Sequence, residues 1–510
     1  MTTEQRLPSA VPSITEGEQL PETDDATSYD IPLSAQLQEA IAKDWDPAPP
    51  MPHPARPDAA PTAARHRAAV SARFAGRPVV VPAGADKARA NDTDYPFRAA
   101  SSFTWLTGET VADAVLVMLP RGGGAGSGGH DSALYVREYA QPGEVAYFTN
   151  RRHGAVWVGN VPSLADTAEV LSLPTRPLDQ LAADLRPLAE AEAAVLTGVD
   201  PAVDALLPRG SGSELAQVID DLRLTKDAWE IGRLRYACEV TGRGFADVVR
   251  ELPAVRGRDD LRAERWLEGT FWRRARLEGN DVGYTSIVAA GPHGTTLHWW
   301  RNNGPVPPGQ LLLADMGVES EELYTADVTR TMPIDGAWMP AQLRVYRAVL
   351  EAQTAGIAEV KAGADFLAAH RAAMWVLADH LHSWGVLPVP AEVACAEDPE
   401  RPGAGLHRRY TLHGTSHMLG IDVHDCALAR AGNYRDGTLA AGYVLTVEPG
   451  LYFQPNDLSV PAELRGTAVR IEDDIAVTDG APENLSGSLP RDPDELLAWM
   501  REVQGTPAAP

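Results

Sequence analysis

The sequence predicts an α/β protein in which two mixed domains follow an amino-terminal extension. Between about residues 66 and 206, short valine-rich runs alternate with alanine- and leucine-rich stretches, as expected for strands and helices. From about residue 214 onward, long segments with apolar residues at three-to-four spacing predict helices, and short β-branched runs between them predict strands. The chain has 510 residues, enough for two or three domains with sizeable cores.

Residues 1–64 form an acidic extension that ends in a proline-rich linker, DPAPPMPHPARPDAAP. Residues 1 to about 30 are predicted to be disordered, and a short helix is expected near Ser34–Lys43. The first residues have no apolar core of the signal-peptide type, and no run approaches about 18 apolar residues. Only three cysteines occur, without paired spacing, which fits a reducing compartment. We therefore expect a cytoplasmic protein that contacts no membrane.

Residues 65–210 are predicted to form the first α/β domain. Its strand candidates are RPVVVPAG, DAVLVMLP and SALYVRE. The glycine-rich stretch RGGGAGSGGH (121–130) joins the last two and is expected to be a hairpin loop. No helix follows these glycines, so a phosphate-binding loop is rejected.

Residues 211–486 are predicted to form the second domain, and residues 487–510 a short helix and a tail. A helix is expected in DAWEIGRLRYACEVTGRGFADVVREL, with two more near 341–362 and 367–384. These last two helices separate two segments that carry potential metal ligands.

Two aspartates lie in neighbouring strand candidates. Asp315 ends the apolar run QLLLAD, and Asp327 lies in ADVTRT after a turn-like GVESEE stretch. Strands joined by a tight connection are expected to be antiparallel, which places the two carboxylates side by side. An edge hairpin with solvated carboxylates is the alternative, but the β-branched neighbours of Asp327 favour burial.

Three of the thirteen histidines fall within the segment HGTSHMLGIDVHD, which runs from His413 through His417 and His424. A single histidine is usually a packing or surface residue, but three among glycines that permit close backbone approach favour a functional segment. Further on, Glu448 closes the β-branched run YVLTV before a Pro-Gly turn, and burying it is costly unless it is paired or ligated. Glu472 lies in AVRIEDDIAV, where a salt bridge to Arg470 is as plausible as ligation.

Together, Asp315, Asp327, His417, Glu448 and Glu472 make a candidate metal-ligand set. Four buried carboxylates repel one another, and two divalent cations that they share are the usual compensation. One imidazole among carboxylates favours manganese, iron, cobalt or zinc over calcium or magnesium.

These motifs resemble the metallopeptidase family that includes aminopeptidase P, prolidase and methionine aminopeptidase, whose shared fold is called the pita-bread fold. The five candidates match its dinuclear ligand set in order: two aspartates in a hairpin that ends in DVTRT, a histidine in HGTSHMLGIDVHD, and a glutamate each in TVEPGLY and RIEDD. Serine before the ligand histidine, and YPFRAASSFTWLTG at 95–108, are most similar to aminopeptidase P. The resemblance covers about residues 65–485 and implies an aminopeptidase P-like domain followed by a pita-bread catalytic domain.

The resemblance also implies a role for each residue. Asp327 and Glu472 bridge two metal ions, expected to be Mn²⁺ with Co²⁺, Fe²⁺ and Zn²⁺ as alternatives, Asp315 chelates one of them, and His417 and Glu448 complete the other. A hydroxide between the ions attacks the carbonyl of the first residue, with Glu448 as general base. The remaining positions match residues that contact substrate or orient ligands: His298 and His424 at the tetrahedral intermediate, His413 and Tyr284 at the proline ring, and Arg470 behind the carboxylates. Without the family match, His298 reads as a histidine packed against Trp299 and Trp300.

The implied activity is removal of the first residue from peptides with proline in second position. A prolidase, which cleaves only Xaa-Pro dipeptides, is the nearest alternative, and a catalytically silent scaffold on the same fold is a remote one. A net charge of −25 makes nucleic acid an unlikely partner. The family resemblance further implies a homodimer or homotetramer.

Overall fold

The computed structural model describes residues 33–505, apart from 47–50, 52, 55, 56, 92, 123–128, 209, 211, 260 and 261. The segment predicted to be disordered, residues 1–30, lies outside the described residues, as does much of the proline-rich linker. Helix α1, Ala35–Ile41, begins where the sequence predicts, because the Ser34 side chain accepts a hydrogen bond from the Leu37 amide. The predicted α/β class is confirmed.

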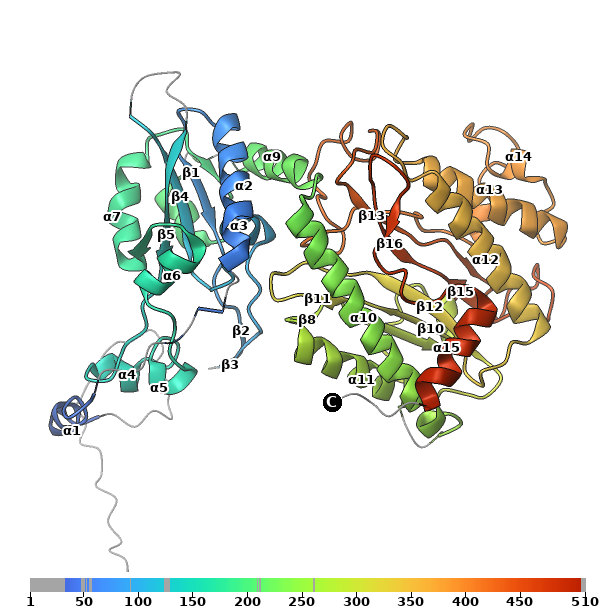
Figure 1. The fold of residues 1–510 in the computed structure, drawn as a ribbon, viewed down its shortest axis with the longest axis horizontal. Helices are drawn as coiled ribbons and strands as arrows, with labels where there is room; N and C mark the ends of the chain where they lie inside the picture. The colour runs from blue at the N-terminus through green and yellow to red at the C-terminus, as the bar shows by residue number, and fades with distance from the viewer. Residues whose placement is uncertain are drawn as a thin grey trace, which may run out of the picture.

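The amino-terminal lobe is built on a mixed five-stranded sheet with the order β6-β5-β4-β1-β7 (Figure 1). The central pairs β1–β4 and β4–β5 are antiparallel, whereas the short edge strands β7 and β6 pair in parallel with β1 and β5. The glycine-rich stretch thus joins two antiparallel neighbours, as predicted. The strands are β1 Val79–Pro82, β4 Val115–Pro120, β5 His130–Val136, β6 Thr175–Pro177 and β7 Ala194–Val195.

Both faces of this sheet are covered. Val79 and Val81 face a core that includes Phe103, and Val80 between them faces a second core that includes Leu185. This alternation is the two-residue period of a strand. The helices and small strands of the lobe are α2 Ala60–Arg73, α3 Ser101–Thr107, α4 Val145–Thr149, α5 Ala155–Val158, α6 Leu164–Leu171, α7 Leu181–Leu185 and α8 Pro201–Leu206, with β2 Ala88–Ala90 and β3 Thr93–Asp94.

Helix α9 packs on α2, α3 and β7 of the amino-terminal lobe and leads into the carboxy-terminal lobe, which starts with the 28-residue helix α10. The Asp227 side chain caps the first turn of α10, and Glu230 bonds back to the Asp227 amide, which fixes where the helix begins. Strands occupy the middle of this lobe, with α10 and α11 on one side and α12 and α13 on another (Figure 1). The helices are α9 Ser213–Arg223, α10 Ala228–Val255, α11 Ala263–Glu278, α12 Pro340–Ala358, α13 Ala368–Ser383, α14 Ala391–Ala394 and α15 Pro493–Gly505.

Two groups of strands support the candidate ligands. In the first, β10 pairs antiparallel with both β9 and β12, which puts Asp315 opposite Thr329. The connection is less tight than predicted, because it contains β11, which pairs with β8. In the second, β13 pairs with β16 and β14 with β15. The strands are β8 Asp281–Val282, β9 Ile287–Ala290, β10 Leu311–Met316, β11 Val318–Glu319, β12 Val328–Pro333, β13 Val444–Val447, β14 Gly450–Tyr452, β15 Ala468–Arg470, β16 Asp473–Ala476 and β17 Glu483–Asn484.

The two lobes share contacts at their junction. The Trp105 indole of the first lobe donates to Glu230 at the start of α10, at 3.1 Å, and Arg98 pairs with Glu319 at 2.7 Å. One apolar cluster contains residues of both lobes, among them Phe103 and Leu234. Among the described residues, no helix combines the length and apolar character needed to cross a bilayer.

Candidate metal centre

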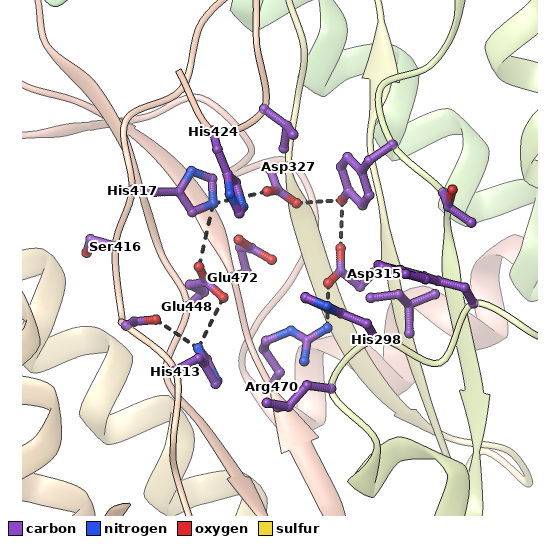
Figure 2. Close-up of a pocket in the computed structure, with 17 residues that line it drawn as sticks. His298, Asp315, Asp327, His413, Ser416, His417, His424, Glu448, Arg470 and Glu472 are labelled. Atoms are coloured by element: carbon purple, nitrogen blue, oxygen red, sulfur yellow. Dashed lines mark hydrogen bonds and ion pairs between the residues drawn. The ribbon is translucent and has the colours of Figure 1, made fainter. Parts of the chain in front are cut away.

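Asp315 and Asp327 meet around one tyrosine hydroxyl. Asp315 lies near the end of β10 and Asp327 just before β12, and both are at least 93% buried. The Tyr284 hydroxyl lies 2.6 Å from one Asp315 oxygen and 2.5 Å from one Asp327 oxygen (Figure 2). The predicted neighbourhood of the two carboxylates is therefore present, and their burial removes the alternative of a solvated edge hairpin.

His417 approaches the same cluster from the opposite segment of chain. Its Nε2 atom lies 3.3 Å from Asp327 Oδ2 and 3.6 Å from Glu448 Oε1 (Figure 2). Its Nδ1 atom lies 3.1 Å from the carbonyl oxygen of Met418. A proton on Nδ1 that is donated to this carbonyl leaves the Nε2 lone pair directed at the carboxylates, which is the tautomer a metal ligand requires.

Glu472 lies between β15 and β16 and is 1% exposed. Thr329, which is fully buried on β12, donates its hydroxyl proton to Glu472 Oε2 at 2.6 Å. The two segments also exchange a backbone bond, from the Glu472 amide to the Thr329 carbonyl. Glu472 is therefore held by the strand that follows Asp327.

Arg470 pairs with Asp315 and makes no ion pair with Glu472 in the described part of the chain. Its guanidinium also donates to the hydroxyls of Thr329 at 3.1 Å and Tyr452 at 3.0 Å. Tyr452 in turn lies 2.8 Å from Nε2 of His413. The alternative of a salt bridge between Arg470 and Glu472 is therefore absent, and Arg470 instead belongs to a chain of contacts that links Asp315 to the histidine segment.

The four carboxylates carry more negative charge than the nearby cations offset. Burial, and then the neighbouring carboxylates, raise the pKa of Glu472 well above its usual range. Burial likewise raises the pKa of Glu448, to about 8. Burial alone lowers the pKa of a histidine, but the contact with Asp327 and the charge of Glu448 raise that of His417 to about 9. Without further cations, the site therefore favours protonated ligands.

The residues fit divalent metal ions. One ligand atom each from Asp327, His417 and Glu472 lies within 4.8 Å of the others. Asp315 and Glu448 flank this group, so the donors are four carboxylates and one imidazole that come from both groups of strands. Added positive charge relieves their repulsion, and this donor set matches the preferences of transition metals more closely than those of calcium.

The cluster opens into a cavity of about 580 Å³, which Figure 2 shows from within. His298 and His424 line it, and neither ring has a hydrogen-bond partner among the described residues. The His298 ring stacks on Trp300 with a centroid distance of 5.2 Å, and the His424 ring lies 4.2 Å from that of His417. Both histidines can therefore offer ring nitrogens to a bound molecule. The cavity is lined by Tyr284, Thr285, Ile287, Leu297, His298, Trp300, Asp315, Asp327, His413, Gly414, Ser416, His417, Val423, His424, Glu448, Arg470 and Glu472.

Thr329 and Tyr452 also take part in this network, although sequence reasoning did not single them out. Both lie inside motifs that carry ligands, two residues after Asp327 and four after Glu448. Strand periodicity could have found Thr329, because it shares a strand face with Asp327. No local pattern marks Tyr452, since its partners come from distant segments.

A second group of metal-ligand types lies at the junction of the lobes and comprises His66, Asp227 and Glu230. Its donors are already used within the protein. Asp227 and Glu230 cap α10, and Glu230 also accepts from the hydroxyl of Tyr324 at 2.9 Å. We therefore assign these three residues a structural role at the junction of the lobes and not a metal-binding role.

Comparison with known proteins agrees with the geometry. Residues 232–479 match the model of metallopeptidase family M24, and residues 63–196 match the aminopeptidase P N-terminal domain. "Xaa-Pro aminopeptidase 2" of Streptomyces coelicolor is 49% identical over 476 residues, which cover 93% of this chain and 97% of that protein. The chain belongs to the aminopeptidase P branch of metallopeptidase family M24.

More distant relatives extend this assignment to solved structures. "Xaa-Pro aminopeptidase" of Escherichia coli is 30% identical over 86% of this chain and 96% of that protein. A structure of aminopeptidase P from E. coli with the inhibitor Pro-Leu superposes with a TM-score of 0.75, at 27% identity, covering 88% of this chain and 99% of that one. The predicted pita-bread catalytic domain is confirmed, and the chain is an enzyme of the metallopeptidase type. The predicted domain boundaries stay predictions.

Proposed function

We propose that this enzyme is a metal-dependent Xaa-Pro aminopeptidase, which removes the first residue of peptides with proline in second position. The observation that carries the proposal is the cluster of three buried carboxylates with the partly buried Glu448 and His417, all of which line one open cavity. The 49% identity to proteins named Xaa-Pro aminopeptidase over most of both chains supports this substrate class over a prolidase.

The proposed cofactor is a pair of divalent ions, Mn²⁺ in the first instance, with Co²⁺, Fe²⁺ and Zn²⁺ as alternatives. Asp315, Asp327, His417, Glu448 and Glu472 would hold them. When bound, such ions polarise a carbonyl and lower the pKa of a water molecule, so that a nucleophile forms at neutral pH.

The proposed general base is Glu448. Its carboxylate lies 3.6 Å from His417 Nε2 and 3.5 Å from His413 Nδ1, at the edge of the cavity. In the absence of metal ions, burial raises the pKa of this carboxylate to about 8, so its protein surroundings by themselves favour the protonated form. Glu448 is therefore suited to accept a proton from the attacking water and to return it to the departing amine.

His298 and His424 are proposed to bind the substrate carbonyl and the oxyanion that develops from it. Burial, and then the nearby His417, lower the pKa of His424 to about 4, so its ring is neutral at pH 7. A neutral ring can still donate one N–H to an oxygen atom. Both rings are free of competing partners in the described part of the chain.

The proline ring is proposed to lie against His413 and the ring face of Tyr284. The hydroxyl of Tyr284 is used by the two aspartates, which leaves its aromatic face for an apolar contact. Ile287 and Leu297 add apolar surface to the same cavity. An Xaa-Pro bond lacks the N–H that general aminopeptidases can bind, so shape and apolar contact must provide selectivity.

Further properties of the enzyme are proposed from its composition and from the family resemblance. A net charge of −25 argues against nucleic acid as a partner, and the three cysteines fit a cytoplasmic location. A homodimer or homotetramer is proposed from the family resemblance. Arg470 is proposed to orient Asp315, with which it pairs.

Product analysis after chelation and Mn²⁺ restoration tests the proposal. Three substrates are compared: a dipeptide Xaa-Pro, a tripeptide Xaa-Pro-Yaa, and a tripeptide without proline. We expect release of the first residue from Xaa-Pro-Yaa only when metal is present, and no release from the proline-free control. Cleavage of the dipeptide alone would identify a prolidase, and inactivity with every divalent metal would favour the silent scaffold.

A further inference from the structure

A second cavity adjoins the candidate metal centre. Its volume is about 920 Å³, and it lies between α13, the segment 395–416 and Tyr434. Three residues line both cavities: His413, Gly414 and Ser416. Figure 2 shows His413 and Ser416 at one edge of the metal centre. A peptide that enters the metal centre therefore has a neighbouring space for the part that follows its second residue. We refer to this second cavity as the outer groove.

The outer groove is basic, although the protein is strongly acidic. Its lining carries Arg371, Arg408 and Arg435 but only one carboxylate, that of Glu397. Arg371 pairs with Asp365 at 2.7 Å. Arg408 and Arg435 are exposed, and neither side chain makes an ion pair within the described ranges of the chain. Two cations are therefore available to a ligand.

The titration of a neighbouring group agrees with a positive potential in the outer groove. Burial, followed by the charges of basic neighbours that include Arg408 and Arg371, lowers the pKa of His370 to about 4. The His370 Nδ1 atom lies 2.9 Å from the Thr415 hydroxyl, in the same chain segment as His417. The wall of the outer groove thus contacts the segment that holds a candidate ligand.

The outer groove also offers apolar surface. The side chains of Trp375 and Leu412 line it and are 46% and 62% exposed. Exposed large apolar side chains beside basic groups suit a ligand with an apolar body and a negative charge. The third and later residues of a peptide begin about 7 Å from its first residue, at about 3.5 Å per residue, and so reach beyond the metal centre.

We propose that the outer groove binds the part of the substrate that follows proline and selects peptides that carry carboxylates there, through Arg408 and Arg435. The inference rests on the proposed function, because it assigns the rest of the same substrate. The carboxylate can belong to an acidic side chain or to the carboxy-terminus of a short peptide. Both sources present the same planar acceptor to a guanidinium group.

The test measures binding rather than turnover. Two labelled product-like peptides, Pro-Ala-Glu-Glu and Pro-Ala-Gln-Gln, are extended by a dye-bearing lysine amide and titrated with the chelated full-length protein by fluorescence anisotropy. We expect tighter binding of the Glu peptide, by about twofold to fivefold for each arginine, as for exposed ion pairs. The difference should shrink with added salt. The double variant R408Q/R435Q should bind both peptides equally.

Arg401→Gln is the matched control, because this exposed arginine belongs to the same segment but does not line the outer groove. It should keep the preference for Glu. Comparing Pro-Ala-Gln-Gln as free acid and as amide distinguishes the carboxy-terminus from acidic side chains. Equal binding of all three peptides to the wild-type protein, or a preference that survives in R408Q/R435Q, would overturn the proposal. Charge-dependent binding without Xaa-Pro cleavage would instead contradict the proposed function alone.

Discussion

Replacing Thr329 by valine removes one hydroxyl group from the metal-ligand network and leaves the outline of the side chain almost unchanged. The Thr329 hydroxyl donates to Glu472 Oε2 at 2.6 Å and accepts from Arg470 Nε at 3.1 Å. The residue is fully buried, so water does not replace the lost group. The variant therefore tests whether Glu472 acts as a ligand that this hydroxyl orients.

The expected effect follows from the protonation of Glu472. In the metal-free protein its raised pKa favours the neutral carboxyl, whose hydrogen bond contributes about 0.5–1.5 kcal/mol. A ligating Glu472 is ionised, and a bond to a charged group contributes about 1.5–3 kcal/mol. The difference of about 1–2 kcal/mol predicts metal binding that is roughly 5- to 30-fold weaker in T329V.

Thr331→Val is the matched control. Thr331 is also fully buried on β12, and its hydroxyl bonds the backbone of Arg470 instead of a carboxylate. Both variants should lower the free energy of unfolding of the chelated protein by about 1–3 kcal/mol. Competition with a chelating dye measures metal affinity, and urea denaturation measures stability. Equal metal affinities for T329V and T331V would refute the proposed ligand role of Glu472.

Three further predictions follow from the described contacts. Glu448 and His417 have raised pKa values of about 8 and about 9, so both groups bind protons more tightly in the folded protein than in the unfolded chain. The chelated protein should therefore lose thermal stability as pH rises from about 5 to 9, and the Mn²⁺-loaded protein should lose less. Scanning calorimetry measures both. Gly317→Ala should strongly reduce folded yield and thermal stability, because a Cβ atom there would lie 1.7 Å from the Ala326 carbonyl oxygen. Asp425→Asn should cost about 3–5 kcal/mol in urea denaturation, because it weakens the pairing of two buried cations.

Each of these predictions has a control. If the thermal stability of the chelated and loaded proteins fell equally with pH, Glu448 and His417 would not dominate the pH dependence. Gly269→Ala, on α11 with open space around its Cβ position, should leave stability unchanged or slightly increased. Arg235→Gln breaks an exposed ion pair with Glu483 and should cost less than about 1 kcal/mol. If D425N lost no more free energy of unfolding than R235Q, the buried ion pairs of Asp425 would matter no more than an exposed pair, which would contradict the prediction.

The candidate ligands could be recognised from the sequence because each lies in a short, distinctive motif; the four carboxylates lie in or directly beside strands, and His417 lies in the coil segment that precedes β13. Asp315 and Asp327 were expected on antiparallel neighbours, and β10 and β12 are such a pair. The partner of Arg470 could not be recognised in the same way. Its position two residues before Glu472 indicates a shared face, but its side chain reaches Asp315 on β10, and only the packing of distant strands sets that contact.

The amino-terminal sheet shows a similar limit. The valine-rich runs predict β1, β4 and β5, the three central strands. The edge strands β6 and β7 are only three and two residues long, too short for a periodic pattern. The outer groove was likewise beyond sequence reasoning, because segments near residues 370, 400 and 412 form it only after folding.

Because they share an apolar cluster at their junction, the two lobes are not independent modules. Val70 and Phe103 from the first lobe pack in the same cluster as Leu234, Tyr324 and Leu419 from the second. Cutting the chain between the lobes would expose this surface on both pieces and leave Glu230 without its indole donor. An amino-terminal domain taken from a relative would therefore fit only together with the second-lobe residues that it packs against. Residues on the two sides of the junction are thus expected to change together in sequence.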